Sequence, residues 1–231
     1  MYRFTVVTLI STLTACGSSM DYYHSPNFNS SLNRFQHPDG DPSNKKPSEL
    51  FAMMREFYKR KYDQSEQNGF PVEISEQNEI STFSDSVMWI GQSTILLNYK
   101  NLTVLTDPQF SNRASPLFFG GPKRVTPTPF EIEDLPNIDI VLISHNHYDH
   151  LDRSSIKDLV KHQPSIKFMV PLGLAQTLHK WGAVDVTELD WWQAVKFQEI
   201  EIQPTPVKHW SSRSLFDRNK SCLLYTSPSP R

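Results

Sequence analysis

Three histidines and one aspartate lie within six consecutive positions, at His145, His147, Asp149 and His150. Side chains two residues apart point to the same side of an extended segment, so His145 and His147 can bind one metal ion together. Asp149 and His150 are adjacent, and a turn there can direct them toward a second ion roughly 3.5–4 Å away. Imidazole nitrogens with a carboxylate suit zinc, with iron or manganese as alternatives. We therefore predict a metal centre; the alternative is a solvated, histidine-rich loop.

The residues on either side predict where this cluster lies in the fold. An apolar run over 138–143 is typical of a buried strand. A polar run over 152–160 predicts a helix with Asp152 as its N-cap. The cluster, here named the histidine loop (residues 145–150), is therefore expected between the end of a strand and the start of a helix.

The histidine loop and several flanking blocks resemble a known family. His145-x-His147-x-Asp149-His150 is similar to the metal-binding signature of the metallo-β-lactamase superfamily. The flanking blocks narrow the resemblance to its N-acyl-phosphatidylethanolamine-hydrolysing phospholipase D branch, and it covers residues 83–220. These blocks are Trp89-Ile90-Gly91-Gln92-Ser93-Thr94, Leu105-Thr106-Asp107-Pro108, Arg113-Ala114-Ser115-Pro116, Gly121-Pro122-Lys123-Arg124, Leu142 to Asp152, Val170-Pro171-Leu172-Gly173 and Glu188-Leu189-Asp190-Trp191-Trp192.

The resemblance implies a fold, a site and an activity. The fold is an α/β (α+β) αββα sandwich, of which this chain carries the N-terminal half and part of the second. The site holds two zinc ions, and His209 completes the first with His145 and His147. Asp149 and His150 bind the second ion, and Asp149 also orients the attacking water. The activity is hydrolysis of a phosphodiester on the headgroup side of an N-acylated phosphatidylethanolamine, so the expected partner is a phospholipid.

Asp107 and Gln92 also bear on the site. Asp107 ends a predicted strand and can accept a hydrogen bond from a ligand imidazole; the alternative is a turn aspartate before Pro108. Related proteins often carry a histidine where Gln92 stands, so no role of that histidine transfers to this chain.

Apolar periodicity predicts the supporting elements. Antiparallel strands are expected over 87–90, 94–99 and 102–106, with a hairpin turn at Lys100-Asn101. A strand over 166–170, a helix over 171–181, and strands over 184–189 and 199–208 should follow. The loop over 108–136 carries Phe118-Phe119 and Lys123-Arg124, which suit a lipid with an anionic headgroup unless the phenylalanines pack in the core.

The N-terminal part predicts export and anchoring. Residues 1–16 have the character of an export signal, and Leu13-Thr14-Ala15-Cys16 resembles a bacterial lipobox. The resemblance implies lipidation of Cys16 and a place in the cell envelope, anchored to the outer membrane and facing the periplasm; a plain secretory signal is the alternative. Residues 17–47 are expected to be a tether and irregular lead-in, and 48–62 a helix that packs on the domain or lies on a membrane surface.

The C-terminal residues fit no continuing pattern. Cys222 to Arg231 equal the translation of a sequencing-library transposase adaptor, so we expect an artefact over 222–231 and a truncated metallo-β-lactamase-like domain over 48–221. A bridging Asp and a last His of the related proteins would then be missing, and the fragment would fold poorly and be inactive. Cys16 and Cys222 are not expected to form a disulfide.

Composition sets the outer bounds. The chain has 231 residues, 38% hydrophobic and 21% charged, with a net charge of -2, which excludes a strongly basic nucleic-acid binder. Two rival functions stay open: another hydrolase of the same fold, such as a lactonase on a sugar phosphate, and a non-catalytic metal-binding envelope lipoprotein.

Overall fold

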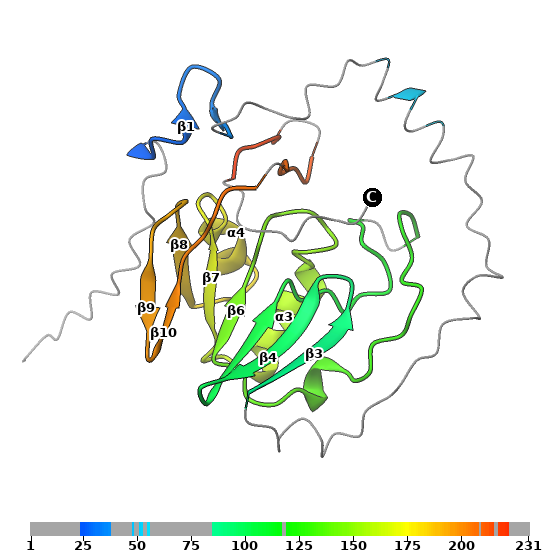
Figure 1. Cartoon of the computed structure of the whole chain (residues 1–231). Coiled ribbons are helices and arrows are strands. Elements are labelled where there is room, and N and C mark those ends of the chain that lie inside the picture. Colours follow the sequence, from blue (N-terminus) through cyan, green and yellow to red (C-terminus); the bar gives the residue numbers. More distant parts are fainter. Residues whose placement is uncertain are drawn as a thin grey trace, which may run out of the picture.

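A six-stranded mixed sheet forms the centre of the protein in the computed structural model (Figure 1). The structure describes residues 24–37, 48, 51–52, 55, 85–116, 119–207, 209–214 and 217–221. The strand order is β3-β4-β5-β6-β7-β8. β3, β4 and β5 pair antiparallel, and β5 also begins the parallel set that continues through β6, β7 and β8. The bounds are β3 Ser86–Gly91, β4 Thr94–Tyr99, β5 Leu102–Thr106, β6 Ile140–Leu142, β7 Lys167–Pro171 and β8 Asp185–Leu189. The predicted α/β class is confirmed.

The antiparallel strands follow their local sequence signals. Lys100 and Asn101 have φ values of 50° and 59°, the left-handed conformation that a two-residue hairpin turn requires. Strands β4 and β5 therefore pair Tyr99 with Leu102, as the sequence predicts. The turn between β3 and β4 contains Gln92 at φ 52°, and the register shifts just before it, between Trp89 and Gly91.

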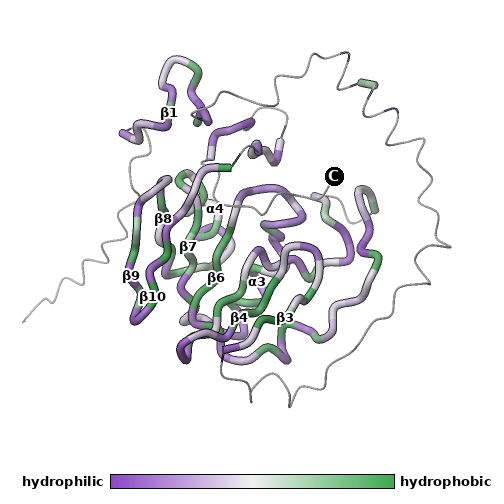
Figure 2. Tube along the Cα trace, in the orientation of Figure 1, coloured by the Kyte–Doolittle hydropathy of each residue, from purple (hydrophilic) through white to green (hydrophobic). Residues whose placement is uncertain are grey.

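Two helices cover one face of the sheet. α3 (Arg153–His162) begins as predicted at Asp152, whose carboxylate accepts a hydrogen bond from Ser155 N. α4 (Ala175–Lys180) lies behind β7 and β8 in Figure 1. Apolar residues follow β4, β6 and β7 in Figure 2, and their helix-facing side chains pack beneath α3 and α4. This core holds the carboxyl ends of β5 and β6 side by side, where the histidine loop begins.

A hairpin covers part of the opposite face. β9 (Val195–Phe197) and β10 (Ile200–Ile202) pack on Val104, Ile140, Met169 and Leu189. The strand predicted over 199–208 is wrong over 203–207, because Pro204 and Pro206 have no N–H to continue a ladder.

Residues 24–37 pack against the domain. They lie within the segment expected to be a tether, and they form a short hairpin of β1 (Phe28–Asn29) and β2 (Arg34–Phe35). Phe28 and Phe35 are buried with Leu172 and Trp191. The lead-in therefore contributes a small core of its own.

Several predictions lie outside the described residues. These are the export signal with Cys16, the tail over 222–231 and most of the helix over 48–62. Among the residues that the structure does describe, no helix has the length and apolar character needed to cross a membrane.

Candidate metal centre

Three histidines from two distant segments converge at the carboxyl end of β6. His145 Nε2 lies 2.9 Å from His147 Nδ1, and His209 Nε2 lies 3.2 Å from the same nitrogen. One ligand nitrogen from each ring lies within 4.8 Å of the other two. His145 is buried, at 1% exposure, whereas His147 and His209 are partly open. The structure thus brings together the three residues predicted for the first ion, here named the His triad.

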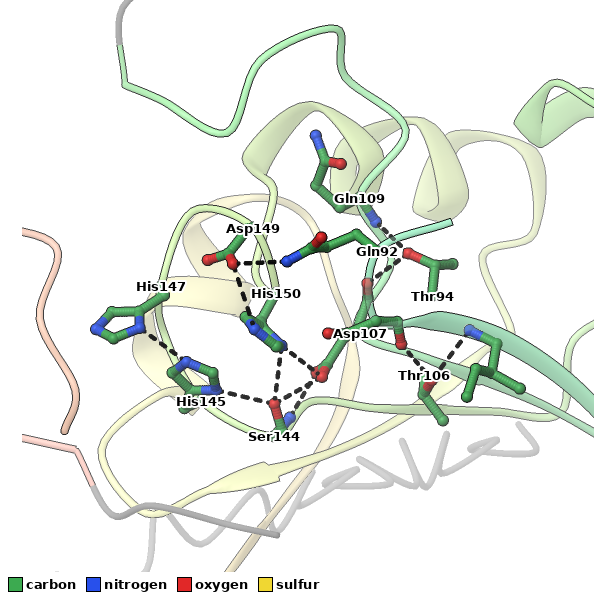
Figure 3. A network of polar contacts seen from close by, with 12 residues as sticks. Gln92, Thr94, Thr106, Asp107, Gln109, Ser144, His145, His147, Asp149 and His150 are labelled. Atoms are coloured by element: carbon green, nitrogen blue, oxygen red, sulfur yellow. Dashed lines mark hydrogen bonds and ion pairs between the residues drawn. The ribbon is translucent and has the colours of Figure 1, made fainter. Parts of the chain in front are cut away.

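Ser144 and Asp107 fix which ring nitrogen carries the proton in His145 and in His150; Figure 3 shows these contacts. Asp107 accepts hydrogen bonds from Ser144 N at 2.7 Å, Ser144 Oγ at 2.6 Å and His150 Nδ1 at 2.8 Å. Since the hydroxyl hydrogen of Ser144 goes to Asp107, Ser144 Oγ accepts from His145 Nδ1, 2.9 Å away. His145 and His150 then both carry their proton on Nδ1, and each presents an Nε2 lone pair to the site.

The triad is neutral at physiological pH. Burial lowers the pKa of His147 to about 4, with further lowering by His209. Burial, followed by His150, also lowers the pKa values of His145 and His209. Burial alone would lower the pKa of His150 too, but the hydrogen bond and charge of Asp107 outweigh it and raise that pKa. Neutral imidazole is the form that binds a metal ion.

Asp149 and His150 form a second group beside the triad. His150 N and Leu151 N both donate to His147 O, so the loop makes the turn that the sequence predicts after His147. The turn brings His150 Nε2 to 3.5 Å from Asp149 Oδ2. Gln92 Nε2 donates to the same carboxylate oxygen at 3.0 Å. Asp149 and His150 therefore face one point, as expected for two ligands of a second ion.

The donor set fits metal ions. His147 Nδ1 is within hydrogen-bond distance of two other ring nitrogens, His145 Nε2 and His209 Nε2. His145 Nε2 carries a lone pair, because the contact with Ser144 places the His145 proton on Nδ1. One proton on His147 Nδ1 cannot satisfy both neighbours fully, whereas one cation accepts three lone pairs at once. Three imidazole nitrogens with a nearby carboxylate are ligands that zinc prefers. His145, His147 and His209 would hold one ion, and Asp149 and His150 would contribute to a second.

A cleft of about 720 Å³ opens beside the loop. His147, Tyr148 and Asp149 form one part of its wall. The rest of the wall includes two tryptophans and two cationic residues: Trp89, Trp210, Lys123 and Arg124. The Arg124 guanidinium donates to the backbone and side-chain oxygens of Gln109, which holds the cation at the cleft.

Sequence reasoning assigned no role to three residues that contribute to the site. Gln92 reaches Asp149, Ser144 relays Asp107 to His145, and Trp210 packs its ring 4.3 Å from that of His147. Ser144 sits directly before the metal signature, and Trp210 directly follows His209, so adjacency was the available signal. Gln92 is 57 residues from its partner, and the signal available for it was its position where related proteins often carry a histidine.

Comparison with known proteins agrees with this arrangement. Residues 103–225 match the model of the beta-lactamase superfamily domain. The chain is 39% identical over 140 residues to N-acyl-phosphatidylethanolamine-hydrolyzing phospholipase D 1 of Caenorhabditis elegans, covering 57% of this chain and 39% of that protein. It is 39% identical over 150 residues to the mitochondrial N-acyl-phosphatidylethanolamine-hydrolyzing phospholipase D of Saccharomyces cerevisiae, covering 63% and 32%. An uncharacterized Mycobacterium tuberculosis protein is 42% identical over 132 residues, covering 56% and 35%.

These matches extend over part of each relative. The chain spans 32 to 39% of the length of these curated relatives. The matched region nevertheless includes β5 to β10, the histidine loop and His209, which are the elements that build the site. The family expected from the sequence is therefore confirmed. The chain belongs to the beta-lactamase superfamily.

Proposed function

We propose that this protein is a zinc-dependent hydrolase, a phosphodiesterase of the phospholipase D type that acts on N-acyl-phosphatidylethanolamine-like lipids. The observation that carries the proposal is the convergence of the His triad beside a cleft whose wall includes His147 and Asp149. Two relatives in the same family, each 39% identical, carry the name of this activity, which supports the choice of substrate.

Bound metal ions would supply Lewis acidity, which polarises a phosphoryl oxygen and lowers the pKa of water. The chain's own residues do the rest. Asp149 keeps 36% of its side chain exposed at the cleft, so its carboxylate can accept a hydrogen bond from the attacking water and orient it. Asp107 and Ser144 keep His145 and His150 in the tautomer that leaves Nε2 free.

The cleft suits a lipid with an anionic headgroup. Lys123 and Arg124 provide positive charge for a phosphate. Trp89 on the cleft wall is 63% exposed, and Phe119, outside the cleft lining, is 67% exposed, so apolar surface is available for acyl chains. We further propose that lipidated Cys16 anchors the protein to the outer membrane, where such a substrate would lie.

The test uses the protein expressed from its native gene, loaded with zinc. Vesicles containing N-acyl-phosphatidylethanolamine are compared with vesicles of plain phosphatidylethanolamine and with a soluble lactone. Hydrolysis should release N-acylethanolamine and leave phosphatidic acid. The matched control is H145A/H147A, which removes two triad nitrogens and should lower the rate to background. Faster hydrolysis of the lactone would overturn the proposed substrate in favour of a lactonase.

A second candidate is a metal-binding envelope lipoprotein without catalytic activity. The observation in its favour is that, among the described residues, the second position has two protein ligands against three for the first. A single zinc ion per chain by elemental analysis, with no hydrolysis of any of these substrates, would support this candidate.

A further inference from the structure

One arginine ties the segment of His209 to the histidine loop. Arg213 Nη1 donates to the carbonyl oxygens of Asn146, at 2.9 Å, and Leu151, at 2.6 Å. These two carbonyls bracket the four residues 147–150, which contain His147, Asp149 and His150. A single guanidinium group therefore holds both ends of the turn that presents three of the candidate ligands.

The guanidinium is fixed from several sides. It lies 4.0 Å from the ring centroid of Tyr148 and 5.3 Å from that of Trp181. Tyr148 Oη donates back to Arg213 O at 2.9 Å. Asp217 accepts hydrogen bonds from Arg213 N and Ser214 N, which holds the backbone on the other side. The side chain thus has little freedom to leave the loop.

The charges of Asp152 and Asp217 act on Arg213, but neither carboxylate pairs directly with its guanidinium. Within the described ranges, no carboxylate oxygen lies within ion-pair distance of the Arg213 guanidinium. A partly buried charge is costly unless it is well hydrogen-bonded, and here the acceptors are backbone oxygens of the histidine loop. The hydrogen bonds of the partly buried guanidinium therefore hold the backbone of the histidine loop in place.

We propose that Arg213 is a positioning residue that sets the separation between His209 and the pair His145–His147. His209 stands 62 residues after His147 and reaches it at 3.2 Å, with Arg213 four residues further along the chain. Arg213 Nη1 donates to both carbonyls while the guanidinium plane lies over the Tyr148 ring, and a lysine ammonium has no planar group to place over that ring. The inference rests on the metal site of the proposed function.

The experiment measures zinc affinity, in competition with a chromophoric chelator, for the protein from its native gene. R213K keeps the positive charge but loses the planar guanidinium group that lies over Tyr148. It should weaken zinc binding at the triad about 10-fold to 100-fold, the range seen when the support of a metal ligand is removed. R113K is the matched control, because Arg113 Nη1 also donates to a carbonyl, that of Gly121 at 2.8 Å, away from the loop. Its affinity should stay within about twofold of wild type.

A second comparison separates positioning from general stability. If Arg213 acts by aligning His209, R213K should change zinc affinity by less than about twofold in an H209A background. A merely structural role would give the same loss with and without His209. Y148F removes only the hydroxyl that holds Arg213 O, and it gives a milder variant if R213K does not fold. It should weaken zinc binding about threefold, again only when His209 is present.

The outcomes are distinguishable. Wild-type protein that binds no zinc at the triad overturns the proposed function and this inference with it. Wild-type binding with unchanged affinity in R213K and Y148F overturns this inference alone. An equal loss in the presence and absence of His209 also overturns it and leaves the proposed function intact.

Discussion

The two halves of the candidate metal centre are held in different ways. In the His triad, three ring nitrogens from segments 62 residues apart face one another, at 2.9 and 3.2 Å. In the second group, Asp149 and His150 are adjacent, and each is already tied to a protein partner, Gln92 at 3.0 Å and Asp107 at 2.8 Å. The triad has a set of lone pairs that one cation satisfies, whereas the second pair is satisfied in part by hydrogen bonds.

This difference suggests that the triad provides most of the affinity for metal, whereas the contacts of the second group orient Asp149 and His150. Burial lowers the pKa values of the triad histidines and keeps them neutral, so the triad is prepared to bind a metal ion first. Contacts with Asp107 and Gln92 instead aim His150 and Asp149 at the cleft. We therefore expect the triad to be the tighter site and the second group to be sensitive to its supporting contacts.

The largest effect should come from removing a triad ligand. H209A deletes one of three nitrogens and should weaken binding of the tighter zinc ion by more than about 100-fold, beyond the range for supporting contacts. Chelator competition measures this affinity. H162A is the control, since His162 is exposed on α3 and lies 3.4 Å from Glu133, outside the triad. Equal affinity in H209A and wild type would remove His209 from the site.

A smaller effect should follow from D107N, and it should be greater for the weaker ion, because Asp107 contacts His150 directly and His145 only through Ser144. An amide in place of the carboxylate turns a donor toward Ser144 Oγ or His150 Nδ1, which disturbs the aim of His150. Affinity for the second ion should fall about 10-fold to 100-fold, in a calorimetric titration that resolves two steps. D139N is the matched control, because Asp139 accepts a backbone hydrogen bond from Thr103 N far from the histidines. A greater loss at the tighter ion would reverse the comparison.

Acidification should destabilise the metal-free protein through the triad. The folded pKa of His147 lies at about 4, below the 6.5 of an unfolded chain, so the unfolded state binds more protons as pH falls from 6.5 toward 4. The raised pKa of His150 acts in the opposite direction, but three lowered values oppose it.

The free energy of unfolding should therefore fall between pH 7 and pH 5, with His147 contributing about 1 kcal/mol after allowance for solvent screening. Urea titrations at the two pH values measure the change. In H147A the drop should be smaller by that amount, and in H162A it should match wild type. A drop of the same size in H147A would contradict the assignment to the triad.

The smallest effect should come from Q92A, which frees Asp149 from its amide partner. An exposed hydrogen bond contributes about 0.5 kcal/mol, so affinity for the second ion should change by about twofold to threefold. Q203A is a matched control, since Gln203 also donates one hydrogen bond from an exposed amide, to Trp192 O at 3.1 Å. A change above tenfold would mean that Gln92 is part of the metal site itself.

Local signals predicted much of the fold. The bounds of β4 and β5, the Lys100-Asn101 turn and the Asp152 cap follow from periodicity and from turn and cap chemistry. Strand β9 and the β1–β2 hairpin were not predicted, and β10 is a short part of a longer predicted strand. The β9–β10 hairpin exists because it covers Ile140 and Met169, and the β1–β2 hairpin because it packs on Trp191.

The sequence by itself determined which atoms can bind a metal ion and how the histidine loop presents them. Residue type and a spacing of two or one positions are local properties, fixed by the geometry of a strand end and a turn. Only the tertiary structure decided which of these atoms meet. His209 approaches His147 across 62 residues, and Gln92 approaches Asp149 across 57, because the sheet and its helices hold their segments together. Burial, which is a property of the packed fold, then decided that the triad is neutral.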